Sequence, residues 1–311
     1  MVPEQSPKYL NPNLYQMSII TGTTNLVGLL GKPVSHSLSP VMHNAAYKHM
    51  GLDWCYMAIP CEKTQIKQIV KALRFMDCKG LNITIPHKQE ILNSCNKLTT
   101  IANKVQAVNT LIPEKNNEWI GANTDIEGFL VPLKNKNLTD KNVIVIGCGG
   151  SARAVVMGLS NLQLKQITII GRNEDSLNIF MKDMKNLCTK NNILIESMTN
   201  EASHITPYIK EASLIINTTP IGMNKKNIEK QDIPLGFEIW NNLSDKTILY
   251  DLIYNPRPTN WLKLGQERNC LTIDGLDMLV EQGALSIRLW SGFNDIPTEI
   301  MKSSAKKQLM L

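Results

Sequence analysis

The sequence has few aromatic residues and no cysteine pattern of the kind that holds zinc or a disulfide framework. Aromatic side chains make up 5% of the 311 residues, too few for a platform that stacks nucleic-acid bases. The seven cysteines are odd in number and include no C-x-x-C pair, which indicates free thiols in a reducing cytoplasm. The net charge of +6 is spread along the chain, so nucleic acid is not an expected partner. No apolar run is long enough for a membrane span.

Two further absences concern metals and targeting. The five histidines show no metal-ligand spacing, so no metal site is expected. Residues 1–18 are polar, contain Pro3, Pro7 and Pro12, and lack the apolar core of a signal peptide, which indicates a flexible extension. A mildly positive charge suits small anionic ligands, so we expect a small-molecule partner, and the sequence leaves a monomer and a homodimer both open.

Strand-like and helical segments alternate along the chain, which is typical of an α/β fold with largely parallel sheets. With 43% hydrophobic residues, a chain of this length can bury two cores, so we expect two domains. The expected strands are residues 25–30, 80–85, 107–112, 143–146, 167–170, 193–195, 214–216, 247–253 and 271–273. The expected helices include 40–49, 154–159 and a last long helix over 276–290, with a hinge near 123–127.

A glycine-rich loop follows the apolar run 143–146 and precedes a helical stretch. It reads Gly147-Cys148-Gly149-Gly150-Ser151-Ala152-Arg153, which fits the G-x-G-x-x-A pattern in its strand–turn–helix context. Gly147 allows the tight turn, Gly149 lets the backbone approach a pyrophosphate, and Ala152 lets the helix pack closely on the strand. The alternative is a turn used only for packing. Because about half of the chain precedes this loop, we expect the first half to carry a substrate site.

Two serines, Ser37 and Ser39, precede a predicted helix that begins at Pro40. Ser39 before Pro40 is a good pair for capping a helix, and capping alone explains that serine. Ser37 adds a second hydroxyl at the same positive helix end, so the two form a plausible cradle for a carboxylate.

The segment Asn82-Ile83-Thr84-Ile85-Pro86-His87-Lys88 ends a predicted strand. Asn82 and Thr84 share one face of that strand, and Pro86 stops it. Lys88 is expected in the first turn of a following helix, where the helix dipole disfavours a cation and favours the neutral amine used in proton transfer. An exposed loop lysine is the alternative, and this segment alone favours it.

Asn109, Asp125 and Gln282 complete a polar set. Asp125 precedes a helical stretch, so helix capping is its simplest role. Gln282 lies in an apolar stripe of the last long helix, where its amide needs a hydrogen-bond partner in the core or on a ligand.

Taken together, these motifs resemble the shikimate dehydrogenase family from about Asn25 to Trp290. The motifs that carry the resemblance, in chain order, are residues 31–40 (GKPVSHSLSP), 82–88 (NITIPHK), 107–110 (AVNT), 121–125 (GANTD), 147–150 (GCGG) and 274–282 (DGLDMLVEQ). The resemblance implies reversible, NADPH-dependent reduction of 3-dehydroshikimate to shikimate, on the route to chorismate and the aromatic amino acids.

The resemblance also implies roles for particular residues. Lys88 and Asp125 would be the catalytic pair, which reverses the expectation for Lys88 as a loop lysine. The implied substrate-binding residues are Ser37, Ser39, Asn82, Thr84, Lys88, Asn109, Asp125, Tyr254 and Gln282. The implied cofactor-binding residues are Gly147, Cys148, Gly149, Gly150, Ser151, Ala152, Arg172, Asn173, Thr219, Met223 and Gly275. Residues 19–123 and 275–311 would form the substrate-binding domain, with a Rossmann domain over 124–274.

Cofactor preference can be read at the end of the second Rossmann strand. NAD binders usually carry an acidic residue about 20 positions beyond the loop, to hold the ribose 2′-hydroxyl. Here that place holds Arg172 and Asn173, and an arginine can contact a 2′-phosphate. NADP-preferring relatives often have a second basic residue where this chain has Ser176, and Glu174 and Asp175 add negative charge. We therefore expect NADP(H), with dual use of NAD possible.

Two other functions stay open. A quinate/shikimate dehydrogenase with dual NAD and NADP use has the same fold and catalytic pair, but it needs a looser pocket near Ser37, Ser39 and Thr84. A catalytically silent relative could act as a ligand sensor, although a sensor has no need of the Lys88–Asp125 pair.

Overall fold

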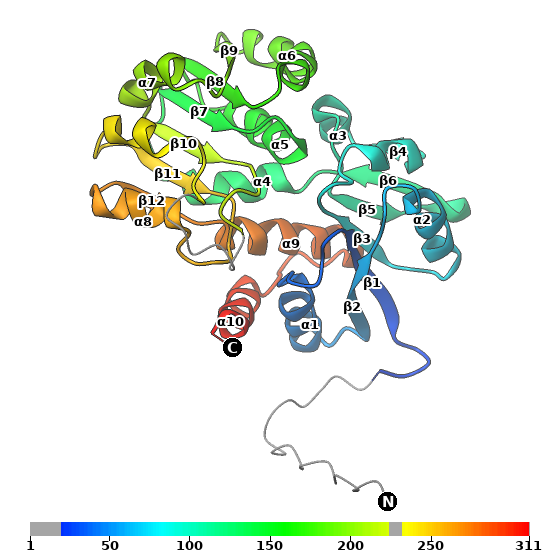
Figure 1. Ribbon diagram of the computed structural model, residues 1–311. Helices are drawn as coiled ribbons and strands as arrows, with labels where there is room; N and C mark the ends of the chain where they lie inside the picture. The colour runs from blue at the N-terminus through cyan, green and yellow to red at the C-terminus, as the bar shows by residue number, and fades with distance from the viewer. Residues whose placement is uncertain (1–19, 224–231, 311) are drawn as a thin grey trace, which may run out of the picture.

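The computed structural model describes residues 20–223 and 232–310, which form two six-stranded sheets with helices on both faces (Figure 1). The predicted α/β fold is confirmed. The predicted flexible extension, residues 1–18, lies outside the described residues.

The first sheet is built from the N-terminal half of the chain. Its strands are β1 (Asn25–Gly31), β2 (Trp54–Pro60), β3 (Gly80–Ile83), β4 (Lys97–Leu98), β5 (Thr110–Pro113) and β6 (Trp119–Ala122). Their spatial order is β2-β1-β3-β5-β6-β4. Three of the pairings are parallel, but β5 runs antiparallel to both β3 and β6. This sheet is therefore mixed.

Helices cover both faces of the first sheet. They are α1 (Ser39–Met50), α2 (Ile66–Phe75), α3 (Thr100–Val105), α9 (Leu276–Ser291) and α10 (Thr298–Leu309), with short 3-10 helices η1 (Glu90–Ser94) and η2 (Lys115–Asn117). Alternate residues of β1 point to opposite faces. Val27 and Leu29 pack in a core with α1, α9 and α10, whereas Leu30 packs in a second core with α2. The result is a three-layer arrangement.

The second sheet is entirely parallel. Its strands are β7 (Asn142–Ile146), β8 (Gln166–Gly171), β9 (Leu194–Thr199), β10 (Leu214–Asn217), β11 (Ile248–Asp251) and β12 (Leu271–Ile273), in the order β12-β11-β10-β7-β8-β9. From β7 the chain builds outward through β8 and β9, and it then returns to β10 on the other side of β7. Ligands of doubly wound sheets bind at the carboxyl ends of the strands at such a switch point.

The second sheet also has helices on both faces. They are α4 (Asp125–Leu130), α5 (Gly150–Leu159), α6 (Glu174–Thr189), α7 (Ala202–Glu211) and α8 (Asn260–Glu267), with 3-10 helices η3 (Val131–Leu133) and η4 (Phe237–Asn242). Val143 and Val145 pack with α5 and α6, whereas Ile144 and Ile146 pack with α7 and α8. A strand buried on both faces reads as a continuous apolar run, which is how β7 appears in the sequence.

Helix α9 ties the two sheets together, and it lies beside α4 between them (Figure 1). Leu276, Val280 and Ile287 belong to the core of the first sheet, but Met278 belongs to the core of the second. Gly128 of α4 permits close approach of the two helices, since a Cβ there would lie 2.9 Å from the Met278 carbonyl oxygen.

Several predicted boundaries were wrong. The strand expected over 80–85 ends at Ile83, because the chain turns at Thr84, whose carbonyl accepts a hydrogen bond from the His87 N–H. Lys88 therefore lies in a turn, two residues before the 3-10 helix η1, and not in the first turn of a helix. The strand expected over 107–112 begins only at Thr110, and α10 follows what was expected to be the last long helix.

A tight contact between β3 and α9 gives a stability prediction. A Cβ at Gly80 would lie 2.3 Å from the Trp290 ring, whose indole N–H is held at 3.0 Å from the Leu111 carbonyl oxygen. Gly80→Ala should therefore lower the free energy of unfolding by about 1–3 kcal/mol, measured by urea denaturation. Gly22→Ala is the matched control, because a Cβ there meets nothing within 4 Å. Equal stabilities of the two variants would contradict the prediction.

Candidate functional site

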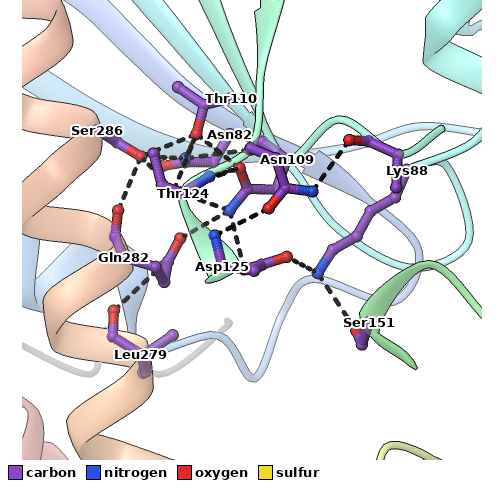
Figure 2. A network of polar contacts seen from close by, with 12 residues as sticks. Asn82, Lys88, Asn109, Thr110, Thr124, Asp125, Ser151, Leu279, Gln282 and Ser286 are labelled. Atoms are coloured by element: carbon purple, nitrogen blue, oxygen red, sulfur yellow. Dashed lines mark hydrogen bonds and ion pairs between the residues drawn. The ribbon is translucent and has the colours of Figure 1, made fainter. Parts of the chain in front are cut away.

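An ion pair between Lys88 and Asp125 lies at the centre of the candidate site (Figure 2). The Lys88 Nζ is 2.6 Å from Asp125 Oδ2, and the two side chains are only 13% and 6% exposed. Lys88 belongs to the turn after β3 and Asp125 is the first residue of α4, so segments 37 positions apart supply the pair. The Lys88 Nζ is also 3.4 Å from the hydroxyl of Ser151, the second residue of α5.

The Asn109 side chain holds Asp125 from the other side. Its Nδ2 donates to Asp125 Oδ1 at 2.8 Å and to Thr124 Oγ1 at 2.9 Å, and it lies 3.3 Å from Gln282 Oε1. Its Oδ1 accepts from the Thr124 backbone N–H at 2.8 Å. Gln282 completes its own hydrogen bonding by donating to the Leu279 carbonyl at 2.8 Å. The buried amide predicted in the apolar stripe therefore has two protein partners.

A layer of buried hydroxyls lies behind these amides, and the sequence analysis missed it. Asn82 Nδ2 donates to Ser286 Oγ at 2.9 Å, and Ser286 Oγ is 2.9 Å from Thr110 Oγ1. Asn82 Oδ1 accepts from the Tyr56 hydroxyl at 2.8 Å. Ser286 could have been found from its spacing, since it follows Gln282 by four residues and so shares its face of α9.

The two serines of the first motif lie beside tyrosines. Burial raises the pKa of Tyr254, while its hydrogen bond with the Ser37 side chain lowers it. Burial likewise raises the pKa of Tyr56, while the neighbouring Ser39 side chain lowers it. The Tyr56 hydroxyl donates to Asn82, so Tyr56 belongs to the amide network. Thr84 lies directly after β3 and packs against Gly31, where a Cβ would be 2.3 Å from its methyl carbon.

Neither expected helix cap forms. Ser39 makes no capping hydrogen bond, and its backbone N–H instead donates to Ser37 Oγ at 3.2 Å. Asp125 caps nothing either, because both of its carboxylate oxygens are engaged by Lys88 and Asn109. Both residues thus have partners that helix capping does not explain.

A cavity of about 650 Å³ begins beside Lys88 and runs along the carboxyl ends of β7, β8 and β10. Its wall includes the sequence-predicted residues Lys88, Gly147, Cys148, Gly149, Gly150, Ser151, Arg172, Asn173 and Thr219. Residues that the sequence analysis missed also line it, among them Ile85, Pro86, Gln89, Asn200, Thr218, Pro220, Ile221, Asp232 and Leu235. The cavity lies at the switch point of the second sheet, where a dinucleotide is expected.

The glycine-rich loop fits a pyrophosphate. Gly147 has a positive φ of 110°, and a Cβ there would lie 2.5 Å from Thr218 Oγ1, so the turn requires glycine. Gly149 occupies the N-cap position of α5 and has no side chain to cap the first N–H groups, while a Cβ there would meet nothing within 4 Å. Helix N–H groups left free in this way bind phosphate. Gly150 lies against Lys88, where a Cβ would be 3.0 Å from the Lys88 Cβ.

The far end of the cavity carries an exposed arginine and no acidic residue on β8. Arg172 follows the last residue of β8 and lines the wall together with Asn173 and Ser176. The Asn173 side chain is already engaged, because it caps α6 by accepting from the Ser176 N–H at 2.8 Å. The guanidinium of Arg172 is thus the positive group available to an anionic substituent at this end.

Three predicted cofactor residues do not line the cavity. Ala152 is buried beneath the loop, where it packs against the core of the second sheet. Met223 is 48% exposed beyond the turn that follows β10. Gly275 is buried against the Leu252 carbonyl, where a Cβ would come within 2.0 Å. Within residues 20–223 and 232–310, no three His, Cys, Asp or Glu side chains are grouped to hold a metal ion, and no helix is long and apolar enough to cross a membrane.

The doubly wound sheet, the phosphate-binding loop and the adjacent lysine–carboxylate pair define an α/β dinucleotide-binding dehydrogenase. Three family models match: the shikimate dehydrogenase substrate binding domain over residues 29–111, shikimate / quinate 5-dehydrogenase over 130–260, and the shikimate 5'-dehydrogenase C-terminal domain over 275–306. A shikimate dehydrogenase (NADP(+)) of Prochlorococcus marinus (strain MIT 9515) is 48% identical, covering 94% of this chain and all of that protein. The chain belongs to the shikimate dehydrogenase family.

Solved structures agree with this assignment. A shikimate dehydrogenase in complex with NADP+ superposes with a TM-score of 0.82 at 32% identity, covering 94% of this chain and 98% of that one. A shikimate 5-dehydrogenase of Listeria monocytogenes, in complex with shikimate and NAD, gives a TM-score of 0.79 at 29% identity over 92% and 98% of the two chains.

A buried histidine beneath the site predicts a pH dependence of stability. His43 stacks on Tyr56 with ring centroids 4.1 Å apart, and burial lowers the pKa of His43 from 6.5 to about 3. Between these values the unfolded chain binds a proton that the folded chain excludes. The free energy of unfolding should therefore fall as pH falls, by up to about 1.4 kcal/mol per pH unit from this group.

Urea denaturation at several pH values below 6.5 measures this dependence. His43→Leu should flatten the slope, and His49→Leu is the matched control because His49 is exposed at the end of the same helix. An unchanged slope in the His43 variant would show that this histidine is not the source.

Proposed function

We propose that this chain catalyses the reversible, NADPH-dependent reduction of 3-dehydroshikimate to shikimate, as a shikimate dehydrogenase of the route to chorismate and the aromatic amino acids. The observation that carries the proposal is the Lys88–Asp125 pair, which lies where the amide network meets the dinucleotide cavity. Family membership and the relatives solved with shikimate or NADP+ support the choice of substrate and cofactor.

The polar side chains of the network and of the neighbouring serine motif would bind the substrate. Ser37 and Ser39 hold the substrate carboxylate, and Thr84, Asn109 and Gln282 hydrogen-bond the ring hydroxyls, with Asn82 and Tyr254 beside them. The Ser37 hydroxyl accepts from the Ser39 backbone N–H at 3.2 Å, which holds it in place before substrate arrives. Such preorganisation reduces the entropy lost on binding.

Proton transfer falls to Lys88. When bound, the nicotinamide cofactor supplies a hydride to the C3 ketone of 3-dehydroshikimate. Lys88 Nζ donates a proton to the ketone oxygen as it becomes a hydroxyl, and the amine takes the proton back in the reverse direction. Asp125 holds Nζ at 2.6 Å and is itself held by Asn109, so the proton donor has a fixed position.

The cofactor would be held by the cavity-lining residues Gly147, Cys148, Gly149, Gly150, Ser151, Arg172, Asn173 and Thr219. The other three proposed cofactor residues, Ala152, Met223 and Gly275, do not line the cavity and would act indirectly. The first N–H groups of α5 bind the pyrophosphate, and Arg172 binds the 2′-phosphate that distinguishes NADP from NAD.

We also propose the division into a substrate-binding domain of residues 19–123 and 275–311 and a Rossmann domain of residues 124–274. The packing of Leu276, Val280 and Ile287 of α9 into the core of the first sheet supports this division. A cytoplasmic location is consistent with the seven cysteines, all of which are free thiols.

The direct test is the loss of NADPH absorbance when purified protein is mixed with 3-dehydroshikimate, repeated with NADH and with 3-dehydroquinate. Turnover confined to NADPH and 3-dehydroshikimate supports the proposal. Comparable turnover of 3-dehydroquinate would assign a quinate/shikimate dehydrogenase, and binding of shikimate without turnover would assign a ligand sensor.

Removal of the lysine should abolish most of the chemistry while substrate still binds. Lys88→Ala should lower kcat by about 10²–10⁴-fold, because the ketone oxygen loses its proton donor. Shikimate binding, measured by calorimetry, should weaken far less. Lys79→Ala is the matched control, since Lys79 precedes the same strand and pairs with Asp77; its kcat should equal that of the wild type. A Lys88 variant with wild-type kcat would refute the assignment.

Cofactor preference should depend on Arg172. In the wild type, kcat/KM should be higher with NADPH than with NADH. Arg172→Ala should lower kcat/KM for NADPH by about tenfold or more and leave that for NADH nearly unchanged, since only NADPH carries the 2′-phosphate. A loss of equal size with both cofactors would place the arginine elsewhere in the mechanism.

A further inference from the structure

A buried carboxylate outside the catalytic network lies at the carboxyl end of β11. Asp251 is 0% exposed and accepts three hydrogen bonds. Its Oδ1 accepts from Asn217 Nδ2 at 3.0 Å and from the Ile253 backbone N–H at 3.1 Å, and its Oδ2 accepts from the Thr259 hydroxyl at 2.8 Å. Asp251 lines no part of the cavity, so it does not itself contact the cofactor.

The first partner of Asp251 shapes the cavity wall. Asn217 pairs with Asp251 across β10 and β11, and it precedes the turn that lines the cavity through residues 218–221. Asn217 Oδ1 accepts from the Thr219 backbone N–H at 3.0 Å and from its hydroxyl at 2.7 Å. Asn217 Nδ2 also donates to the Ile221 carbonyl at 3.2 Å. The Asn217 side chain thus holds both Thr219 and Ile221 of the turn. Asp251 in turn fixes the orientation of the Asn217 amide.

The second partner of Asp251, Ile253, precedes Tyr254, one of the proposed substrate-binding residues. Ile253 donates its N–H to Asp251, and its carbonyl accepts from the Gly275 N–H at 3.1 Å at the start of α9. The next residue is Tyr254, which lies next to Ser37 and packs against the same core as Leu38. Asp251 therefore holds the backbone from which Tyr254 projects.

We propose that Asp251 is a positioning residue for both binding sites: through Asn217 it sets the Thr218–Ile221 wall of the cofactor cavity, and through Ile253 it sets Tyr254 beside Ser37. This inference rests on the proposed function, because that function assigns the Thr218–Ile221 wall to the cofactor and the Tyr254–Ser37 region to the substrate. The role requires an acceptor at Oδ1, where both connections meet.

The charge of Asp251 is not essential to this role. Burial raises its pKa to about 7, against the lowering effect of its three hydrogen bonds, and the neighbouring Asp274 raises the pKa further. Asp274 is itself paired with Arg257, and Asp232 faces the other side of the turn, accepting from the Gly222 N–H. An asparagine at position 251 can keep its carbonyl toward Asn217 and Ile253 and turn its amide toward the Thr259 hydroxyl, which can also accept.

Direct binding of NADPH and of shikimate to the full-length protein, measured by calorimetry, tests the inference. Asp251→Ala should raise the Kd of both ligands, that of NADPH by about tenfold, because Asn217 and Ile253 lose their hydrogen-bond acceptor. Asn217→Ala should raise the Kd of NADPH to a similar extent and leave that of shikimate unchanged. Asp251→Asn should restore both values to within about threefold of the wild type. The double variant Asp251→Ala/Asn217→Ala should bind NADPH no more weakly than either single variant.

Thr247→Val is the matched control. Thr247 is buried immediately before the same strand and donates to the Ala212 carbonyl at 2.8 Å, at the end of β11 that faces away from the cavity. Its loss should lower thermal stability without changing either Kd. A wild-type Kd for both ligands in folded Asp251→Ala, or equal weakening in Asp251→Asn, would overturn the inference. Failure of the wild type itself to bind NADPH would instead overturn the proposed function.

Discussion

The site depends on keeping an amine and a carboxylate in contact while both are largely withdrawn from water. Removing two charges from solvent costs several kcal/mol for each ion, and their attraction offsets this only with good geometry and further hydrogen bonds. Asp125 meets both conditions, because one oxygen contacts Lys88 and the other accepts from Asn109. The rest of the polar network, back to Ser286 and Asn82, keeps Asn109 in that orientation.

The fold satisfies this requirement by drawing the pair from places that the chain cannot easily move. Lys88 follows a strand that is buried along its whole length, and Asp125 opens a short helix that packs on α9. Since α9 contributes to the cores of both sheets, a shift of one sheet relative to the other would disturb Gln282 and Ser286 at once. Packing far from the Lys88–Asp125 pair therefore sets the position of Lys88.

Much of this arrangement was predictable from short-range patterns. The buried strand β7 and the loop after it were identified because an apolar run followed by spaced glycines has few other uses. The prediction that Lys88 lies in the first turn of a helix was wrong, because the chain turns at Thr84 and forms a 3-10 helix only from Glu90. The capping roles expected for Ser39 and Asp125 failed for other reasons. The helix already begins at Ser39, which leaves Leu38 at the capping position, and the partners of Asp125, Lys88 and Asn109, are distant in the sequence. Local propensity contains no information about such contacts. The unpredicted helix α10, in contrast, has an acidic residue in its first turn and two lysines in its last turn, which are ordinary helix signals.

Gly150 controls how closely the glycine-rich loop approaches Lys88. Its position in the phosphate-binding loop suggests a residue kept small for the cofactor, yet the atom nearest to an added Cβ would be the Cβ of Lys88. Any larger residue would push the loop and the lysine apart, whether or not a cofactor were bound. The separation between the glycine-rich loop and Lys88, the proposed proton donor, therefore depends on the absence of a side chain at Gly150, and a single methyl group there would increase that separation.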